Sequence, residues 1–326
     1  MKAIVYEKYG PPEGLELREV TKPSPRAKEV LVRLHAVSVN LTDWEYLTGK
    51  PAYARINGLF KPKKKTLGSD IAGVVEAVGS QVTQFIPGDA VFGDILSTQG
   101  GFAEFVCAKE CDLIKKPEGL SFIDASAIPQ AAVIALQGIR DKGQVQSGQR
   151  ILINGAGGGS GSFAIQIAKM LGAEVTGVDS ARKLDLMRSL GADHVIDYEQ
   201  QDFTRNGQTY DVILDLVASR SPFACARALK PTGRYMCVGG PLRMILYLLI
   251  VGGLMSLFSK RKIGVLAVEP GQDALTDVTA LITQGDIKPS VERTFPLGQT
   301  ARAIAYLGTG QSLGKIAVTM PALEAK

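Results

Sequence analysis

The first part of the chain is a series of short apolar runs separated by glycine and proline. Between residues 1 and about 120 these runs are AIVYE, EVLVRLHAVSV, DIAGVVEAVG, DAVFG and GFAEFVCA. Short apolar segments interrupted by Gly and Pro are typical of β-strands that are joined by turns. The pattern therefore predicts an all-β domain over this part of the chain.

Between residues 121 and 267 strand-like segments alternate with helix-like ones. The strand candidates are RILIN, EVTGVD, HVID, YDVILDL and RYMCVGG. Apolar side chains at helical spacing follow the first of them and predict a helix over residues 162–171. The positions that carry this spacing are Ala164, Ile167, Ala168 and Leu171. Because parallel strands need long crossover connections, the alternation favours an α/β fold with a doubly wound parallel sheet. In the remaining tail the pattern predicts a helix over residues 273–284 and a final strand, GKIAVT.

Five of the seven residues from 155 to 161 are glycine, between the strand RILIN and the predicted helix. In this position a bare backbone lets a pyrophosphate approach the helix N-terminus, where free N–H groups and the helix dipole bind it. The predicted contacts are Gly158, Gly159, Ser160 and Gly161. Asp179 follows 24 positions after Gly155, at the end of the next strand, as the acidic residue of a dinucleotide site does. A dinucleotide is the favoured ligand, and a flexible turn without a ligand is the alternative.

Composition and charge exclude some classes of protein. The chain is 45% hydrophobic and 21% charged with a net charge of +5, which is typical of a globular protein. The basic tract KPKKK has no interleaved aromatic residues and predicts a solvated loop, so no nucleic-acid partner is expected. The start, MKAIVYEKYG, lacks the apolar core of a signal peptide. Four cysteines without a CxxC pair suit a reducing compartment, and we expect a cytoplasmic protein.

Six motifs together resemble the medium-chain dehydrogenase/reductase superfamily, and most of all its zinc-free quinone oxidoreductase branch. They are VSVNLTDW, GSDIAGVVEAVG, PGDAVFG, GGGSG, MRSLGADHVIDY and LGKIAVT. The resemblance runs from residue 1 to about residue 320. It implies a GroES-like β-barrel substrate domain over residues 1–123 and a Rossmann dinucleotide-binding domain over 124–265. It also implies that residues 266–326 return to the substrate domain.

The zinc ligands of related dehydrogenases are missing from this sequence. The first ligand cysteine of those relatives would fall near Asn40, and their Gly-His-Glu motif reads Gly68-Ser69-Asp70 here. The two histidines, His35 and His194, lie within or at the start of predicted strands and are expected to be structural. A catalytic zinc needs three protein ligands, and no Cys/His constellation supplies them. We therefore expect no metal site.

Without a Lewis acid, reduction of a quinone or an enone is the favoured reaction. Hydride adds to a conjugated carbon, and a hydrogen-bond donor can stabilise the charge that develops on the carbonyl oxygen. The resemblance places Asn40 near the nicotinamide and substrate, whereas Asp43 is expected to orient its loop. Tyr46 and Tyr53 could donate a proton, or they could simply pack. A non-catalytic dinucleotide-binding redox sensor or assembly partner, and a zinc-free alcohol dehydrogenase, remain alternatives.

The choice between NADPH and NADH rests on residues around the end of the second Rossmann strand. Asp179 could accept a bond from a ribose 2′-hydroxyl, which favours NADH, or it could turn outward. The resemblance adds positions at which NADPH-dependent relatives bind the 2′-phosphate, which are Ser180, Arg182, Lys183 and Tyr198. Arg182 and Lys183 could alternatively be a solvated helix start. We favour NADPH, with NADH open, and the resemblance adds Val217 and Gly239 as further cofactor contacts.

A strongly apolar segment follows the last Rossmann strand. From Met244 to Phe258 only Ser256 is polar, and a KRK tract closes the run. As a helix it would span about 22 Å, which is shorter than the ~30 Å hydrocarbon core of a membrane. We expect it to be buried between the subunits of a homodimer or beside the cleft, with peripheral membrane contact through residues 244–262 as the alternative.

Overall fold

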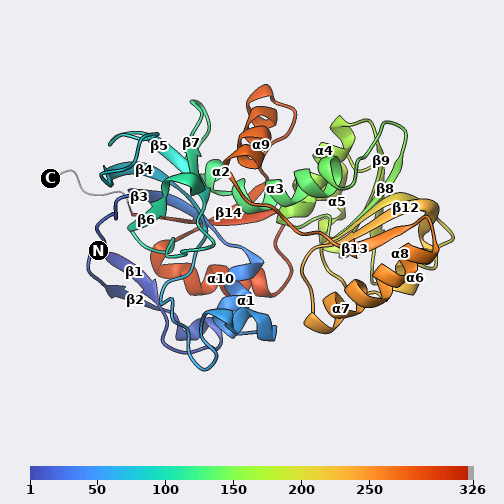
Figure 1. The fold of residues 1–326 in the computed structure, drawn as a ribbon, viewed down its shortest axis with the longest axis horizontal. Coiled ribbons are helices and arrows are strands. Elements are labelled where there is room, and N and C mark those ends of the chain that lie inside the picture. The colour runs from blue at the N-terminus through green and yellow to red at the C-terminus, as the bar shows by residue number, and fades with distance from the viewer. Residues whose placement is uncertain (322–326) are drawn as a thin grey trace. The chain divides into compact units, whose positions relative to one another are not determined.

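A computed structural model of the protein describes residues 1–321, apart from the side chains of Ile56 and Asn57. The chain divides into two compact units (Figure 1). The first contains residues 1–130, 270–279 and 289 to the end of the described chain, and the second contains residues 131–269 and 280–288. These limits differ by a few residues from the predicted boundaries at 123/124 and 265/266. They also assign residues 280–288 to the second unit, because the backbone of Lys288 exchanges two hydrogen bonds of 3.0 Å with the side-chain amide of Gln166.

The first unit is built on a β-sheet, as the sequence pattern predicts. In the described chain its strands run in the order β14-β15-β3-β4-β5-β7, with β6 paired to β3. Their bounds are β3 (Glu29–Ser38), β4 (Asp70–Val78), β5 (Ala90–Asp94), β6 (Phe105–Lys109), β7 (Leu113–Lys115), β14 (Val291–Pro296) and β15 (Lys315–Thr319). A hairpin precedes them, formed by β1 (Lys2–Val5) and β2 (Glu16–Glu19). Strands β14 and β15 pair in parallel, and the other pairs are antiparallel.

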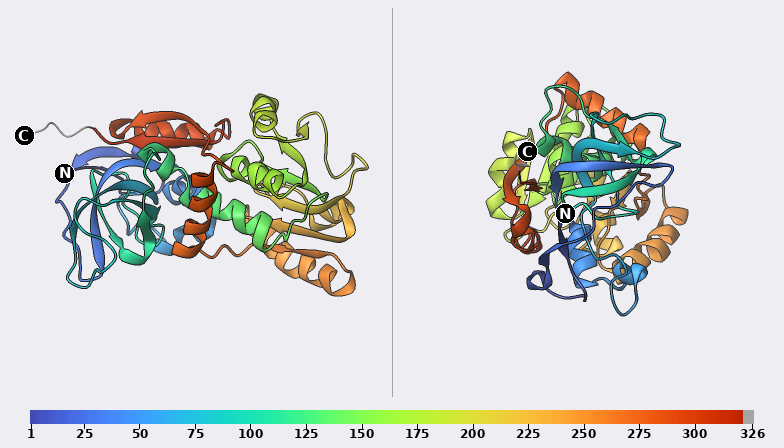
Figure 2. Two further views of the ribbon diagram at one scale, coloured as in Figure 1. Left: turned by 90° about the horizontal axis from the view of Figure 1, so that it is seen from above. Right: turned by 90° about the vertical axis from the view of Figure 1, so that its left-hand side faces the viewer.

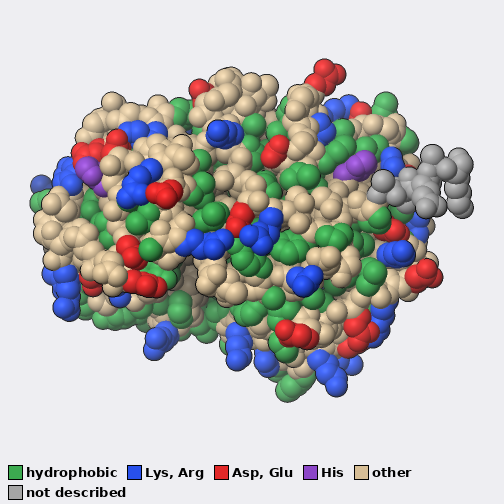
Figure 3. Space-filling view, turned by 180° about the vertical axis from the view of Figure 1, so that it is seen from behind, with side chains coloured by type: hydrophobic (Ala, Val, Ile, Leu, Met, Phe, Trp, Pro, Cys, Tyr) green, Lys and Arg blue, Asp and Glu red, His purple; other side chains and the backbone are tan. Residues whose placement is uncertain are grey.

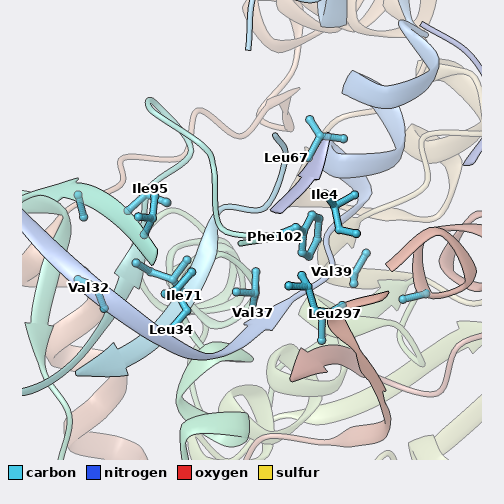
Figure 4. Close-up of a cluster of buried hydrophobic side chains, with 14 of the residues drawn as sticks. Ile4, Val32, Leu34, Val37, Val39, Leu67, Ile71, Ile95, Phe102 and Leu297 are labelled. Atoms are coloured by element: carbon cyan, nitrogen blue, oxygen red, sulfur yellow. The ribbon is translucent and has the colours of Figure 1, made fainter. Parts of the chain in front are cut away.

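A hydrophobic core fills the space enclosed by these strands (Figure 4). Val32, Leu34 and Val37 of β3 point into it together with Ile71 of β4 and Phe102. Burying a side chain of this size stabilises a fold by about 1.5–3 kcal/mol. The alternation of apolar residues along β3 and β4 therefore fixes which face of the sheet turns inward.

The prediction that residues 1 to 120 are all β is wrong where α1 (Leu41–Thr48) and three short 3₁₀ segments interrupt the strands. The carboxylate of Asp43 accepts a hydrogen bond of 2.8 Å from the backbone N–H of Asn40, which caps the helix start. Gly49 ends the helix in the left-handed conformation with φ +64°. Both signals are local, but the helix is too short to show a clear apolar period.

The second unit contains a parallel sheet whose strands, in the described chain, run β10-β9-β8-β11-β12-β13. Their bounds are β8 (Arg150–Asn154), β9 (Glu174–Asp179), β10 (His194–Asp197), β11 (Tyr210–Asp215), β12 (Leu229–Cys237) and β13 (Lys262–Val265). Numbered from β8, this is the order 3-2-1-4-5-6 of a Rossmann sheet. The order in which the strands are added changes side between β8 and β11, while all strands stay parallel. Figure 1 shows α4 and α5 on one side of the sheet and α6 to α8 on the other, so the sheet is doubly wound as predicted.

The helices have bounds close to the expected ones wherever an apolar period predicted a helix. They are α2 (Phe122–Ser126), α3 (Pro129–Leu136), α4 (Gly159–Met170), α5 (Leu184–Ser189), α6 (Pro222–Arg227), α7 (Leu242–Tyr247), α8 (Gly253–Phe258), α9 (Gln272–Gln284) and α10 (Thr300–Gly308). Shorter 3₁₀ or π segments are η1 (Pro12–Gly14), η2 (Ala52–Asn57), η3 (Glu110–Asp112), η4 (Gln137–Asp141), η5 (Ala181–Lys183), η6 (Leu248–Gly252) and η7 (Leu297–Gln299). The expected start of α4 at residue 162 is three residues late, because the glycines themselves form its first turn.

The apolar segment forms one helical run through α7, η6 and α8. Its inner side packs on the core of the second unit through Met244, Leu248 and Met255. Its outer side carries exposed apolar residues, which are Leu242, Leu246, Tyr247, Leu249, Ile250, Leu254, Leu257 and Phe258. No helix between residues 1 and 321 combines the length and the apolar character needed to cross a bilayer.

Candidate cofactor and substrate site

The glycine turn after β8 is shaped so that side chains cannot be added at two of its positions. A Cβ atom on Gly161 would lie 2.2 Å from the carbonyl oxygen of Gly155, and one on Gly157 would lie 2.6 Å from Cβ of Lys183. Gly155 itself has φ +84°, which favours glycine. Gly158 stands directly before α4, and Gly159, Ser160 and Gly161 form its first turn. The first backbone N–H groups of a helix lack partners inside the helix and bind anions such as phosphate.

Asp179, at the end of β9, is buried and fastened to this turn. Its carboxylate accepts hydrogen bonds from the backbone N–H of Gly157 at 3.0 Å and of Ser180 at 2.9 Å. The ammonium of Lys183 lies 3.2 Å from the same carboxylate. The alternative in which Asp179 turns outward is therefore wrong, because three donors hold the carboxylate against the glycine turn.

The other predicted phosphate-binding residues surround Asp179 but differ in exposure. Lys183 is buried in the ion pair with Asp179, whereas Arg182 is exposed on η5. Tyr198 is exposed as well, and its backbone N–H donates to the carbonyl of Asp179 at 3.1 Å. Ser180, Arg182 and Tyr198 thus lie at the carboxyl ends of β9 and β10, where an open α/β sheet binds its ligand. The idea that Lys183 is part of a solvated helix start is wrong, since its side chain is covered.

A residue that the sequence interpretation missed, Asp215, organises the loop after β11. Its carboxylate accepts bonds from the side chains of Asn154 at 2.8 Å and Tyr235 at 2.7 Å. It also accepts the backbone N–H groups of Val217 at 3.0 Å and Ala218 at 2.8 Å. Val217 is therefore held, partly exposed, beside the glycine turn, where a Cβ on Gly155 would lie 3.1 Å from its methyl group. An aspartate inside the apolar run YDVILDL was the signal in the sequence.

Gly239, the last predicted cofactor contact, follows β12 in a left-handed conformation with φ +69°. A Cβ at this position would have no heavy atom within 4 Å. Its carbonyl accepts a hydrogen bond from the thiol of Cys237 at 3.1 Å. The structure therefore places Gly158 to Gly161, Val217 and Gly239 at the carboxyl ends of β8, β11 and β12 in the second unit.

In the first unit, Asn40 belongs to a buried polar network with Lys315, Ser69 and Asp70. Its side-chain oxygen accepts a hydrogen bond from the Lys315 ammonium, and its amide nitrogen donates to the Ser69 hydroxyl at 3.4 Å. The ammonium also lies 3.6 Å from a carboxylate oxygen of Asp70. Sequence reasoning missed Lys315, although a lysine that directly precedes the apolar strand of LGKIAVT was a visible signal. The lysine fixes which end of the Asn40 amide is the acceptor.

Three carboxyl groups near this network have altered proton affinity. Burial raises the pKa of Asp43 to about 7, against the two backbone N–H groups that it accepts, from Asn40 at 2.8 Å and Gly68 at 2.9 Å. Burial and the neighbouring Asp70 raise the pKa of Asp94 to about 7. Burial also raises the pKa of Asp70, and the Lys315 ammonium and the Asn40 amide act against that rise. Asp43 thus orients the start of α1, as expected, inside a group of carboxyls that can hold protons near neutral pH.

The two predicted proton donors have different surroundings. The Tyr53 hydroxyl donates a hydrogen bond of 3.0 Å to the carboxylate of Glu45, and burial raises the pKa of Glu45. Tyr46 is half-buried beside Tyr6 and Tyr9, and burial raises the pKa of its phenol. The phenol of Tyr46 therefore keeps its proton at neutral pH, and the hydroxyl of Tyr53 has a carboxylate in direct contact.

The two histidines are structural in this fold, as expected from their place in strands. His35 stacks on Phe122 with ring centroids 4.2 Å apart, and His194 lies 3.0 Å from Glu174. The donors around Asn40 do not fit zinc, since the ammonium of Lys315 already brings a positive charge between Asn40 and Asp70. Among the described residues no cluster of three or more His, Cys, Asp or Glu could hold a metal. Zinc independence itself stays a prediction.

The second unit, in contrast, fits a dinucleotide. Side chains in place of the glycines would occupy the space in the turn, and α4 starts directly after it. The Asp179 carboxylate is held at the end of the neighbouring strand by the backbone of that turn. This combination of glycine turn, helix N-terminus and acidic residue is the arrangement that binds a pyrophosphate and a ribose.

Comparison with known proteins agrees with this geometry. The family model for the alcohol dehydrogenase GroES-like domain matches residues 26–118, and that for zinc-binding dehydrogenase matches residues 190–318. The chain is 32% identical to the chloroplast envelope quinone oxidoreductase homolog of Arabidopsis thaliana, over 98% of both proteins. It is 30% identical to 2-methylene-furan-3-one reductase of Solanum lycopersicum, over 98% of this chain and 79% of that protein.

Among solved structures, the quinone oxidoreductase from Coxiella burnetii superposes with a TM-score of 0.88 at 30% identity, over 98% of this chain and 99% of that one. The shared fold and the identity along the full length lead to one conclusion. The chain belongs to the medium-chain dehydrogenase/reductase superfamily and to its quinone oxidoreductase-like branch.

Proposed function

We propose that this protein is an NADPH-dependent reductase of quinones or α,β-unsaturated carbonyl compounds and that it works without zinc. The observation that carries the proposal is the glycine turn after β8, with Asp179 bonded to its backbone at the carboxyl end of a parallel sheet. The substrate class is supported by relatives that are named for quinone reduction and for reduction of a methylene-furanone.

The second unit would hold the cofactor by its phosphates and ribose. The N-terminus of α4, at Gly158 to Gly161, would bind the pyrophosphate. A carboxylate at the position of Asp179 usually repels a 2′-phosphate, but the Lys183 ammonium at 3.2 Å neutralises it here. The exposed guanidinium of Arg182 could then bind the phosphate with two parallel hydrogen bonds. This pairing supports NADPH over NADH.

The first unit would supply the donor for the substrate. When bound, the nicotinamide supplies a hydride to the conjugated carbon of the substrate, and negative charge develops on the carbonyl oxygen. The amide nitrogen of Asn40 is the donor we propose for that oxygen, because Lys315 holds the other end of the amide and the bond to Ser69 is long at 3.4 Å. A preorganised donor of this kind contributes about 10²–10³-fold to the rate.

The reduction also consumes a proton, and Tyr53 is the donor we propose. Its hydroxyl already donates a hydrogen bond of 3.0 Å to the Glu45 carboxylate, which fixes the orientation of the phenol. The phenolic proton would pass to the oxygen of the reduced product, and a proton from solvent water would then restore the phenol. Tyr46 is the second candidate for the same step.

The test is NADPH consumption by the purified protein with a panel of quinones, enones and simple alcohols plus their ketones. We expect turnover of quinones or enones, unchanged by a chelator, from protein without stoichiometric zinc by elemental analysis. Turnover of simple ketones and alcohols only would favour the zinc-free alcohol dehydrogenase. Tight NADPH binding without turnover of any compound would favour the redox sensor. One zinc per chain together with chelator-sensitive activity would contradict the proposed mechanism.

Oligomeric state and location are separate proposals. We propose a homodimer, which is supported by β13, because it is the last strand of its sheet in the described chain and its outer edge can pair with a second copy. Light scattering of the purified protein tests this. We also propose a cytoplasmic location, which is supported by four free cysteines.

A further inference from the structure

One long stretch of the second unit carries positive charge without any negative charge. Residues 216 to 268 include eight Lys or Arg residues and no Asp or Glu. This differs from the face of the molecule drawn in Figure 3, where blue basic and red acidic side chains are intermixed. The stretch contains β12, β13 and the helices α6 to α8. Its charge is therefore concentrated on a few neighbouring elements.

Half of these cations have partners in the fold. Arg220 pairs with Asp202 and Lys230 with Asp211, while Arg234 and Arg261 donate to backbone carbonyls. The other four are Arg227, Arg243, Lys260 and Lys262. Among the described residues no carboxylate forms an ion pair with any of these four. Arg243 lies near the start of the run through α7, η6 and α8, and Lys260 and Lys262 follow its end.

Between these cations the outer side of the helical run is apolar. The exposed positions 242, 246, 247, 249, 250, 254, 257 and 258 recur every three or four residues, as one face of a helix requires. Ile250 is 63% exposed and Phe258 is 88% exposed. Figure 2 shows this run, in orange, along the outer side of its unit's sheet. Such a face is rare on the surface of a soluble protein and indicates a binding surface.

The inner side anchors the run firmly to the fold. Leu248 is buried in the core, and a Cβ on Gly252 would lie 2.9 Å from the side chain of Ile263 in β13. The Ser256 hydroxyl accepts the backbone N–H of Ile263 at 2.9 Å and donates to the carbonyl of Gly252 at 2.8 Å. The glycine and the serine thus let the helix lie close against β13. The exposed apolar face is consequently a fixed surface and not a loosely attached segment.

We propose that this outer face docks on a membrane leaflet that contains anionic lipid. The helix would lie in the plane of the interface, with Ile250, Leu254 and Phe258 below the headgroups and Arg243, Lys260 and Lys262 among the phosphates. A run of seventeen residues is about 25 Å long, which suits a helix lying flat on the surface. Apolar insertion and attraction to anionic headgroups are the two contributions that hold such helices.

A second copy of the chain fits this face less well than a lipid surface does. Two helices related by a two-fold axis would bring the cations of both copies to one interface, and the 216–268 stretch offers no carboxylate to pair with them. Like charges that meet at an interface act against association. An anionic leaflet, in contrast, complements the positive charge of all these cations. The proposal goes beyond the proposed function, and vesicle binding does not depend on catalysis, so either can fail alone.

The experiment is co-sedimentation of the full-length protein with vesicles of phosphatidylcholine alone and of phosphatidylcholine mixed with phosphatidylglycerol. We expect binding to the mixed vesicles that weakens as salt is raised, and much weaker binding to the neutral vesicles. Ile250→Ser and Phe258→Ser should each lower the partition coefficient about tenfold, since each removes a large apolar side chain from the interface. Lys260→Gln and Lys262→Gln should each lower it about fivefold on the mixed vesicles.

Two matched controls separate docking from a general effect of surface hydrophobicity. Ile86, at 66% exposed, matches Ile250, and Phe60, at 89% exposed, matches Phe258, but both lie in the first unit. Ile86→Ser and Phe60→Ser should leave vesicle binding unchanged. Circular dichroism and thermal unfolding check that the variants fold, as expected for exposed positions.

The proposal is overturned if the wild-type protein does not bind the mixed vesicles, or if the helix variants bind as well as the controls do. It is also overturned in favour of a second copy if Ile250→Ser and Phe258→Ser convert a dimer into a monomer by light scattering while vesicle binding is unchanged. Loss of vesicle binding in the helix variants alone, with mass unchanged, supports it.

Discussion

Lys315 brings a buried positive charge close to the buried carboxyls of Asp43 and Asp70 and to the partly exposed Asp94. Burial lowers the pKa of its ammonium, and the three carboxyls act against that change. A buried charge is retained only when it is paired, so the lysine and the carboxyls stabilise one another's ionised forms. The Asn40 amide lies between them, which gives it a defined orientation. The Asn40 amide is therefore held by a residue that lies 275 positions away in the sequence.

The Asn40 amide can be tested directly. Asn40→Ala should lower kcat for quinone or enone reduction about 10²–10³-fold, because the donor to the developing oxyanion is lost. The dissociation constant of NADPH should change far less. Ser69→Ala is the matched control, since it removes only the 3.4 Å acceptor of that amide and should cost less than tenfold. Unchanged turnover in folded Asn40→Ala would remove this residue from the mechanism.

The raised pKa of Asp43 predicts that the stability of the fold depends on pH. Its pKa is about 7 in the folded protein against an ordinary value of 3.8, so the folded state binds the proton more tightly than the unfolded state. This carboxyl therefore stabilises the fold most at low pH. Its contribution falls as the pH rises from 3.8 to about 7 and then levels off. The slope approaches about 1.4 kcal/mol per pH unit.

Asp43→Asn isolates this contribution. The unfolding free energy of the wild-type protein minus that of the variant, from urea titrations, should decrease between about pH 4 and pH 7 and then stay level. The carboxamide loses one acceptor for the N–H groups of Asn40 and Gly68, but that loss is the same at every pH. A difference that does not vary with pH would show that Asp43 titrates normally.

Arg182 and Lys183 are neighbours with different expected effects. Arg182→Ala should weaken NADPH binding by about 1.5–3 kcal/mol and leave NADH nearly unchanged, because only NADPH carries the phosphate that the guanidinium would bind. Lys183→Met should disfavour NADPH in the same sense by leaving the Asp179 charge unpaired, and should also lower stability, since Lys183 is buried. Isothermal titration with both cofactors measures these effects. Equal weakening of both cofactors by Arg182→Ala would assign that residue a structural role.

At the scale of an element, the glycine turn before α4 offers a matched pair of substitutions. Gly161→Ala would place a Cβ 2.2 Å from the Gly155 carbonyl, so the turn must shift, at a cost of about 1–3 kcal/mol. Gly158→Ala would place its Cβ 3.4 Å from the same oxygen, which is an ordinary contact. Thermal unfolding should therefore show a lower midpoint for Gly161→Ala and little change for Gly158→Ala. Equal midpoints would mean that the turn is more adaptable than its geometry indicates.

The elements that the sequence predicts well are those whose pattern repeats over several residues. The alternation of apolar strand-like runs with helical periods predicted the parallel sheet, and five glycines between the first of these strands and its helix predicted the glycine turn. Short α1 was missed because its eight residues show little period, although its cap between Asp43 and Asn40 is local. Lys315 and Asp215 were missed for a different reason. Their roles arise from partners that only the folded chain brings near.

The site residues that were predicted show the same limit. Asn40, Asp179 and the glycines were found from local motifs, but the direction of each side chain is set by distant partners. Asp179 faces the glycine turn because Gly157 and Lys183 bind it. The outer face of the α7 to α8 run was recognised as apolar from the sequence, but only the fold separates its buried side from its exposed side.

At the scale of the whole molecule, each unit is assembled from separate stretches of chain. Strand β15 lies between β14 and β3 in the first unit, so a segment from the end of the chain completes a sheet that begins at residue 29. Ile316, Ala317 and Val318 are fully buried there. Neither unit can therefore be completed until most of the chain has been made, and the last strand matters as much as the first.

A pair of truncations tests this dependence. A chain that ends after Gly314 loses β15, its buried Ile316 and Val318, and the Lys315 ammonium beside Asp70. Lost burial contributes about 2–5 kcal/mol per large side chain, and an unpaired buried charge contributes about 3–5 kcal/mol. The sum, on the order of 10 kcal/mol, is comparable to the whole stability of a domain. This chain should fail to give soluble folded protein.

The control is a chain that ends after Pro321, which keeps every contact of the described residues. It should match the full-length protein in soluble yield, circular dichroism and thermal midpoint. The two truncations differ by only seven residues, Lys315 to Pro321, so a difference between them is due to β15 and the residues next to it. If the shorter chain unfolded at the same temperature as the control, the sheet of the first unit would be stable without β15. In that case Lys315 could not be the residue that keeps Asp70 and Asn40 in place.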